Sequence, residues 1–174
     1  MSDNLERFEV QDAVGSYLHC HINITDNVQV TLGGHIEKFE QDIDNRLASA
    51  VSTTSQDDTR LSPQVGAVSL FDYTTSVYAT YGEGFRQLTG SDFAGNPFEP
   101  NESKSAEIGV KADLTSMFNN IRGDITFAVF NIEQSNILVY DDSPEASDGF
   151  FLTPAGEARS RGVELDINAE FEND

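Results

Sequence analysis

Apolar and polar residues alternate without interruption near the end of the chain. In segment 159–171, every second position from Val163 on is apolar and the positions between are polar; the apolar set is Val163, Leu165, Ile167, Ala169 and Phe171. A period of two is typical of an extended strand with one apolar and one polar face. The apolar face needs an apolar surrounding, which is either a protein core or the hydrocarbon of a membrane.

The same period recurs along the chain, and no window shows a convincing helical period. Strands are predicted at 8–24, 28–36, 60–71, 76–86, 106–114, 124–141 and 159–171. The first of them is far longer than the usual strand of about 5–6 residues. The pattern therefore predicts an all-β fold, an antiparallel meander of about seven long strands.

The connections between these strands alternate in length. Short turns are predicted at 25–27, 72–75 and 116–123, and long polar loops at 40–58, 88–103 and 142–158. In a meander, alternate connections lie at the same end of the sheet, so all long loops should share one end. This asymmetry is typical of transmembrane β-barrels. A soluble β-sandwich or a lipocalin-like ligand-binding barrel stays as the alternative.

Composition narrows the class of partner. The chain of 174 residues carries 10 basic and 30 acidic side chains, a net charge of −20, so a nucleic-acid backbone would be repelled. No run approaches the 18 or so apolar residues of a spanning helix. The first residues lack the apolar core of a signal peptide, and none is expected. Cys20 is the single cysteine, so no internal disulfide is expected.

Several short motifs follow one another in order. YATYGEGFR at 78–86 precedes PNES at 100–103 and EIGVK at 107–111, and GEARSRGVELD at 156–166 opens the last strand. Segment 25–40 fits before them as an earlier hairpin, and segment 124–141 fits as the strand that follows 107–111. Together they resemble the barrel of TonB-dependent outer-membrane receptors, particularly the siderophore-receptor branch.

This resemblance implies a plugged barrel of about 22 strands in the cell outer membrane. Such a protein is a transporter, not an enzyme, and needs no cofactor of its own. Its expected partners are a ferric siderophore or similar scarce nutrient, outer-membrane lipid, and the TonB complex. Since only about seven strands are predicted, residues 5–174 are expected to be an internal barrel fragment. Plug domain and closing strands are not recognised in it, and TonB would be contacted through the missing plug region.

Aromatic and cationic residues of the long loops are the candidate ligand site. Four phenylalanines lie in polar stretches, where they have no evident folding role, and two arginines lie at loop bases; the set is Arg86, Phe93, Phe98, Phe150, Phe151 and Arg159. Rings and guanidinium groups suit a flat anionic ferric chelate. We expect the rings to cluster, with both arginines below them facing the lumen. Loop self-packing and ion pairs with nearby acids are the alternatives.

The remaining candidate chemistry favours a wetted strand surface. His19 and His21 lie on the polar face of the first strand, and His35 should lie diagonally across from them on that face. Imidazoles two residues apart can chelate a transition metal, but a polar lumen-facing surface is the preferred interpretation, so no metal site is predicted. The strand carboxylates, such as Glu107 and Glu164, lack a pocket that would make them catalytic.

Overall fold

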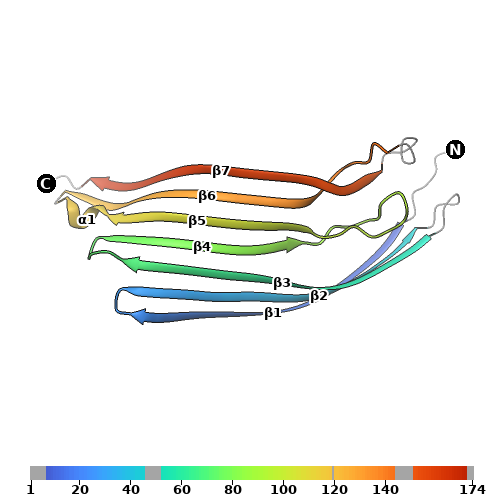
Figure 1. Cartoon of the computed structure of the whole chain (residues 1–174), viewed down its shortest axis with the longest axis horizontal. Helices are drawn as coiled ribbons and strands as arrows, with labels where there is room; N and C mark the ends of the chain where they lie inside the picture. Colours follow the sequence, from blue (N-terminus) through green and yellow to red (C-terminus); the bar gives the residue numbers. More distant parts are fainter. Residues whose placement is uncertain (1–6, 46–51, 119, 144–150, 172–174) are drawn as a thin grey trace.

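Seven antiparallel strands form one sheet in the computed structural model, which describes residues 7–45, 52–118, 120–143 and 151–171 (Figure 1). Strand order follows chain order from β1 to β7. The elements are β1 (Arg7–Thr25), β2 (Val28–Asn45), β3 (Ser52–Leu70), β4 (Thr75–Arg86), β5 (Asn101–Asp113), the single-turn helix α1 (Leu114–Met117), β6 (Ile121–Tyr140) and β7 (Leu152–Phe171). The predicted seven-stranded meander is confirmed.

Connections alternate between the two ends of the sheet as predicted (Figure 1), but their lengths follow the prediction only in part, because 46–51 between β2 and β3 is no longer than 114–120 between β5 and β6. The boundaries of two long loops were wrong. Most of 40–58 is strand, because β2 continues to Asn45 and β3 begins at Ser52, and β7 already begins at Leu152. Residues 40–58 contain few apolar side chains and 152–158 shows no regular alternation, so the pattern does not reveal these strand ends. The ladder of backbone hydrogen bonds does not depend on side-chain polarity, so the strands continue past the apolar pattern.

The register places most apolar strand positions of the short-turn half of the sheet on one face. Directly paired residues of antiparallel strands share a face, and one row of such pairs crosses the whole sheet with an apolar residue on every strand: Ile22, Val30, Ala67, Ala79, Ile108, Val129 and Val163. The next rows on either side repeat the pattern in most strands. The sheet therefore has one continuous apolar face.

Nothing in the described part of the chain covers this apolar face. Val163 is 70% exposed, Leu165 60% and Ile167 58%, whereas a sandwich would bury them between two sheets. The soluble sandwich is therefore wrong, and the expected separation of Val163 and Leu165 from Glu164 and Asp166 holds. Among the described residues, no helix has the length and apolar character needed to cross a membrane.

On the polar face, large rings lie flat over glycines of the neighbouring strand. A Cβ at Gly109 would lie 2.6 Å from ring atoms of Tyr78, and one at Gly162 would lie 2.9 Å from the Phe130 ring. Each ring is paired directly with its glycine in the register. The glycines thus provide the space that lets bulky residues lie against the sheet.

A small core lies at the long-connection end, where the segment 87–100 between β4 and β5 meets β2. Phe39 and Ile43 of β2 are buried, as are Leu88 and Phe98 of the connection. Hydrogen bonds tie the same connection to the outer strands of this region: Gln11 donates to Thr89 Oγ1 at 3.1 Å, and Thr54 Oγ1 donates to the Gly95 carbonyl at 3.1 Å. The connection is therefore a packed element of the fold.

Candidate functional site

The connection between β4 and β5 contains a tight turn that presents Phe93. Ser91 and Pro97 form an isolated antiparallel bridge at its base. Within it, the Asp92 carboxylate accepts the Asn96 backbone N–H at 2.8 Å and the Asn96 side-chain amide at 3.0 Å. Gly95 has φ +84°, a backbone conformation that residues with a side chain disfavour. These contacts hold Phe93 at the tip of an ordered turn.

Two of the four predicted loop aromatics meet at this tip. The rings of Phe93 and Phe151 are 5.0 Å apart between centroids and nearly perpendicular, at 80°, which is a favourable edge-to-face arrangement. Both rings are partly exposed, 48% and 37%. Phe98 is 5% exposed and belongs to the core beneath, so loop packing explains it. Phe150 lies outside the described residues.

A backbone hydrogen bond joins the end of β6 to Phe151, next to this aromatic pair. The Asp141 backbone N–H donates to the Phe151 carbonyl at 3.0 Å. The Asp141 carboxylate accepts the Ser143 backbone N–H at 3.0 Å, and that hydrogen bond lowers the pKa of this carboxyl below its ordinary value. Phe151 is thus attached to the end of β6, where it can meet the β4–β5 connection.

Arg86 lies at the end of β4 on the polar face of the sheet, as expected. It pairs with Asn101 in the register and lines a pocket of about 420 Å³ together with Leu88, Ser103 and Gln134. Within the described ranges, no carboxylate forms an ion pair with Arg86. Its guanidinium is therefore available to an anionic ligand.

Arg159 does not lie where it was expected. It is inside β7, directly paired with Glu133 of β6, and its Nη2 is 2.6 Å from Glu133 Oε1. Because 159 and 163 are separated by an even number of residues along one regular strand, Arg159 shares the face of Val163. The expectation of a lumen-facing arginine at a loop base is wrong for this residue. Arg159 lies beyond Val163 toward the long-connection end of β7, where charged, ion-paired residues replace the apolar ones on this face.

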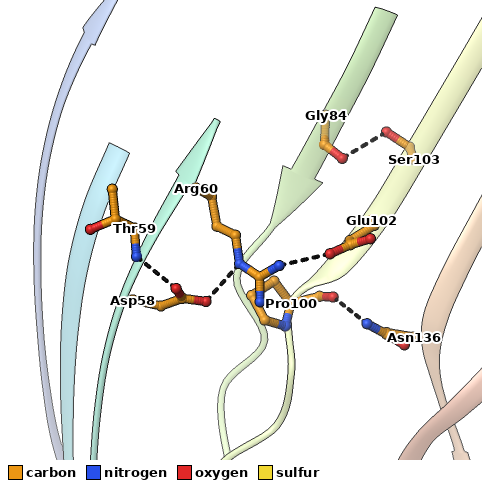
Figure 2. A network of polar contacts seen from close by, with 8 residues as sticks. All are labelled: Asp58, Thr59, Arg60, Gly84, Pro100, Glu102, Ser103 and Asn136. Atoms are coloured by element: carbon orange, nitrogen blue, oxygen red, sulfur yellow. Dashed lines mark hydrogen bonds and ion pairs between the residues drawn. The ribbon is translucent and has the colours of Figure 1, made fainter. Parts of the chain in front are cut away.

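A polar network that the sequence did not indicate joins strands β1–β3 to strands β4–β7 (Figure 2). β3 and β4 pair only between Gln64–Leu70 and Ser76–Gly82, so the strands separate beyond Gln64. Across this gap Arg60 of β3 contacts Asp58 Oδ2 at 2.6 Å and Glu102 Oε1 of β5 at 2.8 Å. Arg60 thereby fixes the distance between β3 and β5 below the loop.

The end of the β4–β5 connection is fastened to β6. The Pro100 carbonyl accepts a hydrogen bond from Asn136 Nδ2 at 3.0 Å (Figure 2), and Asn101 Nδ2 donates to the Ser135 carbonyl at 2.7 Å. Asn136 has φ 56°, a conformation that asparagine tolerates better than most residues. These contacts position Asn101 and the pocket wall next to Arg86.

The side chains gathered here are of types that suit ligand binding. Partly exposed rings lie at the tip, and one unpaired guanidinium lines a pocket beneath the connection. In the part of the chain that the structure describes, no group of three or more histidine, cysteine, aspartate or glutamate side chains could hold a metal ion. The arrangement suits a ligand that is both flat and anionic.

Comparison with known families gives a match over nearly the whole chain. Residues 3–173 match the family described as TonB dependent receptor-like, beta-barrel. Among curated relatives, the ferrichrome outer membrane transporter/phage receptor of Escherichia coli (strain K12) is 35% identical over 83% of this chain. The metal-pseudopaline receptor CntO of Pseudomonas aeruginosa is 30% identical over 94% of it.

A solved structure shows the same fold. The ferripyoverdine receptor of the outer membrane of Pseudomonas aeruginosa, bound to ferripyoverdine, superposes on 95% of this chain with a TM-score of 0.74 at 24% identity. The chain spans about a fifth of each of these proteins: 18% and 22% of the two curated relatives and 21% of the solved chain. The seven strands thus correspond to part of a much larger barrel.

Proposed function

Because this chain belongs to the TonB-dependent receptor β-barrel family, we propose that it forms a section of barrel wall in a receptor that takes up a ferric siderophore or a similar metal chelate. Members of the family are transporters of the outer membrane and not enzymes. The plug region and the TonB complex would drive uptake, and both lie outside the described strands.

The uninterrupted apolar row across all seven strands carries this proposal. Segment 163–171 contains the roughly 9 residues that a tilted transmembrane β-strand needs to cross the hydrocarbon, as in the strands of outer-membrane barrels. Charged pairs such as Arg159 and Glu133 follow directly above it. The opposite face carries polar residues and suits a wetted lumen.

The class of cargo is proposed from the loop end. Curated relatives are named for ferrichrome, metal-pseudopaline, ferripyoverdine and ferrioxamine B, so the shared chemistry is a chelated metal. In this chain the edge-to-face rings of Phe93 and Phe151 would contact an apolar or aromatic part of the chelate. Arg86 would meet its negative charge.

An uptake experiment tests the function. The segment is placed in a complete receptor barrel in iron-starved cells that lack their own receptors, and uptake of radiolabelled hydroxamate, catecholate and opine-type chelates is measured with and without TonB. TonB-dependent uptake of at least one class is expected, and Arg86→Ala should reduce it. A receptor that reaches the outer membrane folded and takes up none of these chelates would refute the proposal.

A further inference from the structure

Two histidines lie side by side on the polar face of β1. The rings of His19 and His21 have centroids 4.6 Å apart and planes inclined at 39°. Both alternate with Leu18, Cys20 and Ile22 of the apolar face, so both imidazoles lie on the wetted side of the sheet. Each imidazole has a ring nitrogen able to bind a borderline transition metal.

The His21 ring is held by a hydrogen bond that leaves one nitrogen available. His21 Nδ1 lies 3.1 Å from the hydroxyl oxygen of Thr31, its direct partner on β2. When Nδ1 donates to this hydroxyl, the lone pair is on Nε2. Histidines that ligate metals are typically oriented in this way through their second nitrogen.

Open space with a further oxygen donor lies opposite His19. The direct partner of His19 is Gly33, which has no side chain, and Gly33 is paired in turn with Gln64 of β3. The Gln64 Oε1 atom lies 3.6 Å from where a Cβ of Gly33 would be, so this amide lies over the glycine. His19, Gly33 and Gln64 line one pocket of about 410 Å³.

We propose that His19 and His21 bind a divalent transition-metal ion, Zn²⁺, Ni²⁺ or Cu²⁺, with the Gln64 amide oxygen and water as additional ligands. Two imidazoles and an oxygen suit these borderline ions better than the hard ferric ion, which prefers oxygen ligands alone. The net charge of −20 raises the local concentration of cations. The site lies on the wall of the polar face and does not depend on which chelate is transported.

His35 is a matched control within the same face. Its ring covers Gly15, where a Cβ would lie 2.6 Å from His35 Nε2, and Nε2 is 3.8 Å from Glu37 Oε2. His35 also lines the pocket of His19, but its ring lies over Gly15, which is four residues from His19 along β1. Replacing it removes an imidazole from the face without touching the pair.

Calorimetric titration of the full chain with Zn²⁺ tests the site, in detergent micelles and with strand content checked by circular dichroism. One Zn²⁺ should bind per chain, and His19→Asn or His21→Asn should weaken binding by at least about tenfold. His35→Asn should leave it unchanged. Unfolding in urea should weaken it by a similar factor, because Thr31 and Gln64 leave the site.

A spectroscopic readout on the unmodified chain keeps the test independent of how the variants fold. With Cu²⁺, electron paramagnetic resonance should show hyperfine splitting from two nitrogen donors, and from one in His19→Asn. Three outcomes would overturn the proposal: absence of Zn²⁺ binding by the folded chain, an equal loss in His35→Asn, or equal affinity in urea.

Discussion

An arginine placed at Ile167 tests the membrane-facing sheet most directly. Ile167 is the central member of the five alternating apolar residues of β7, is 58% exposed, and is paired with Ile125 on the same face. If this face meets lipid, Ile167→Arg places a guanidinium near the middle of the hydrocarbon. We expect a loss of about 2–4 kcal/mol in the free energy of unfolding, the cost of Arg at a bilayer midplane.

The depth dependence sharpens this prediction. Val163 lies at the upper end of the apolar series, close to the Arg159–Glu133 ion pair. An arginine side chain at this position is long enough to reach the headgroup region. Val163→Arg should therefore lower the free energy of unfolding by only about 0–1 kcal/mol. Asp166→Arg is the matched control on the opposite face, where the side chain meets water, and its cost should also be small.

The assay is denaturant unfolding of a complete receptor barrel that contains the segment, folded into lipid vesicles. The order of cost should be Ile167→Arg first, then Val163→Arg and Asp166→Arg. Equal costs at Ile167 and Asp166 would refute the assignment of the two faces. A larger cost at Asp166 would reverse it.

Three further predictions concern the turns and the packing. Gly109→Ala should destabilise the barrel by about 1–3 kcal/mol in denaturant unfolding, because its Cβ meets the Tyr78 ring, and Tyr78→Ala in the same protein should remove most of that loss. Phe98→Ala should cost up to about 3–5 kcal/mol by opening the small core, seen as faster proteolysis of the β4–β5 connection; an unchanged cleavage rate would contradict its burial. Hydrogen bonds from the Thr74 backbone N–H and hydroxyl lower the pKa of Asp72. The stability it contributes is therefore complete above its ordinary pKa of about 3.9 and is lost as pH falls through the lowered value. Asp72→Asn should flatten the stability profile below about pH 4, and an unaltered profile would count against this turn.

The membrane-spanning part of the fold was predictable because each strand carries its own signal. In β7 the alternation from Val163 to Phe171 alone establishes the strand and its two faces. The upper part of β2 has no such signal: Glu40 and Asp42 make one face charged, and Gln41 interrupts the other. The ladder that continues to Asn45 is visible only once its partner strands are known.

The candidate site was predictable only in part, for two different reasons. Phe98 is buried in a connection that is hydrogen-bonded to the distant strands β1 and β3, and no local pattern reports such long-range packing. The face of Arg159, in contrast, follows from counting back from Val163 along one strand. It was misplaced because β7 was expected to begin at 159 rather than at Leu152. Arg60 carried no motif at all and gains its role from the gap between β3 and β4.

Beyond Gln64, β3 and β4 no longer pair, and the β4–β5 connection bridges the gap between them. On one side of the gap the connection continues from β4 into β5, and on the other side it is hydrogen-bonded to Thr54 and Gln11. The gap cannot widen without stretching the connection or breaking these two hydrogen bonds. Because Phe93 lies in this connection, a force that a ligand exerts on its ring acts on the strands on both sides of the gap.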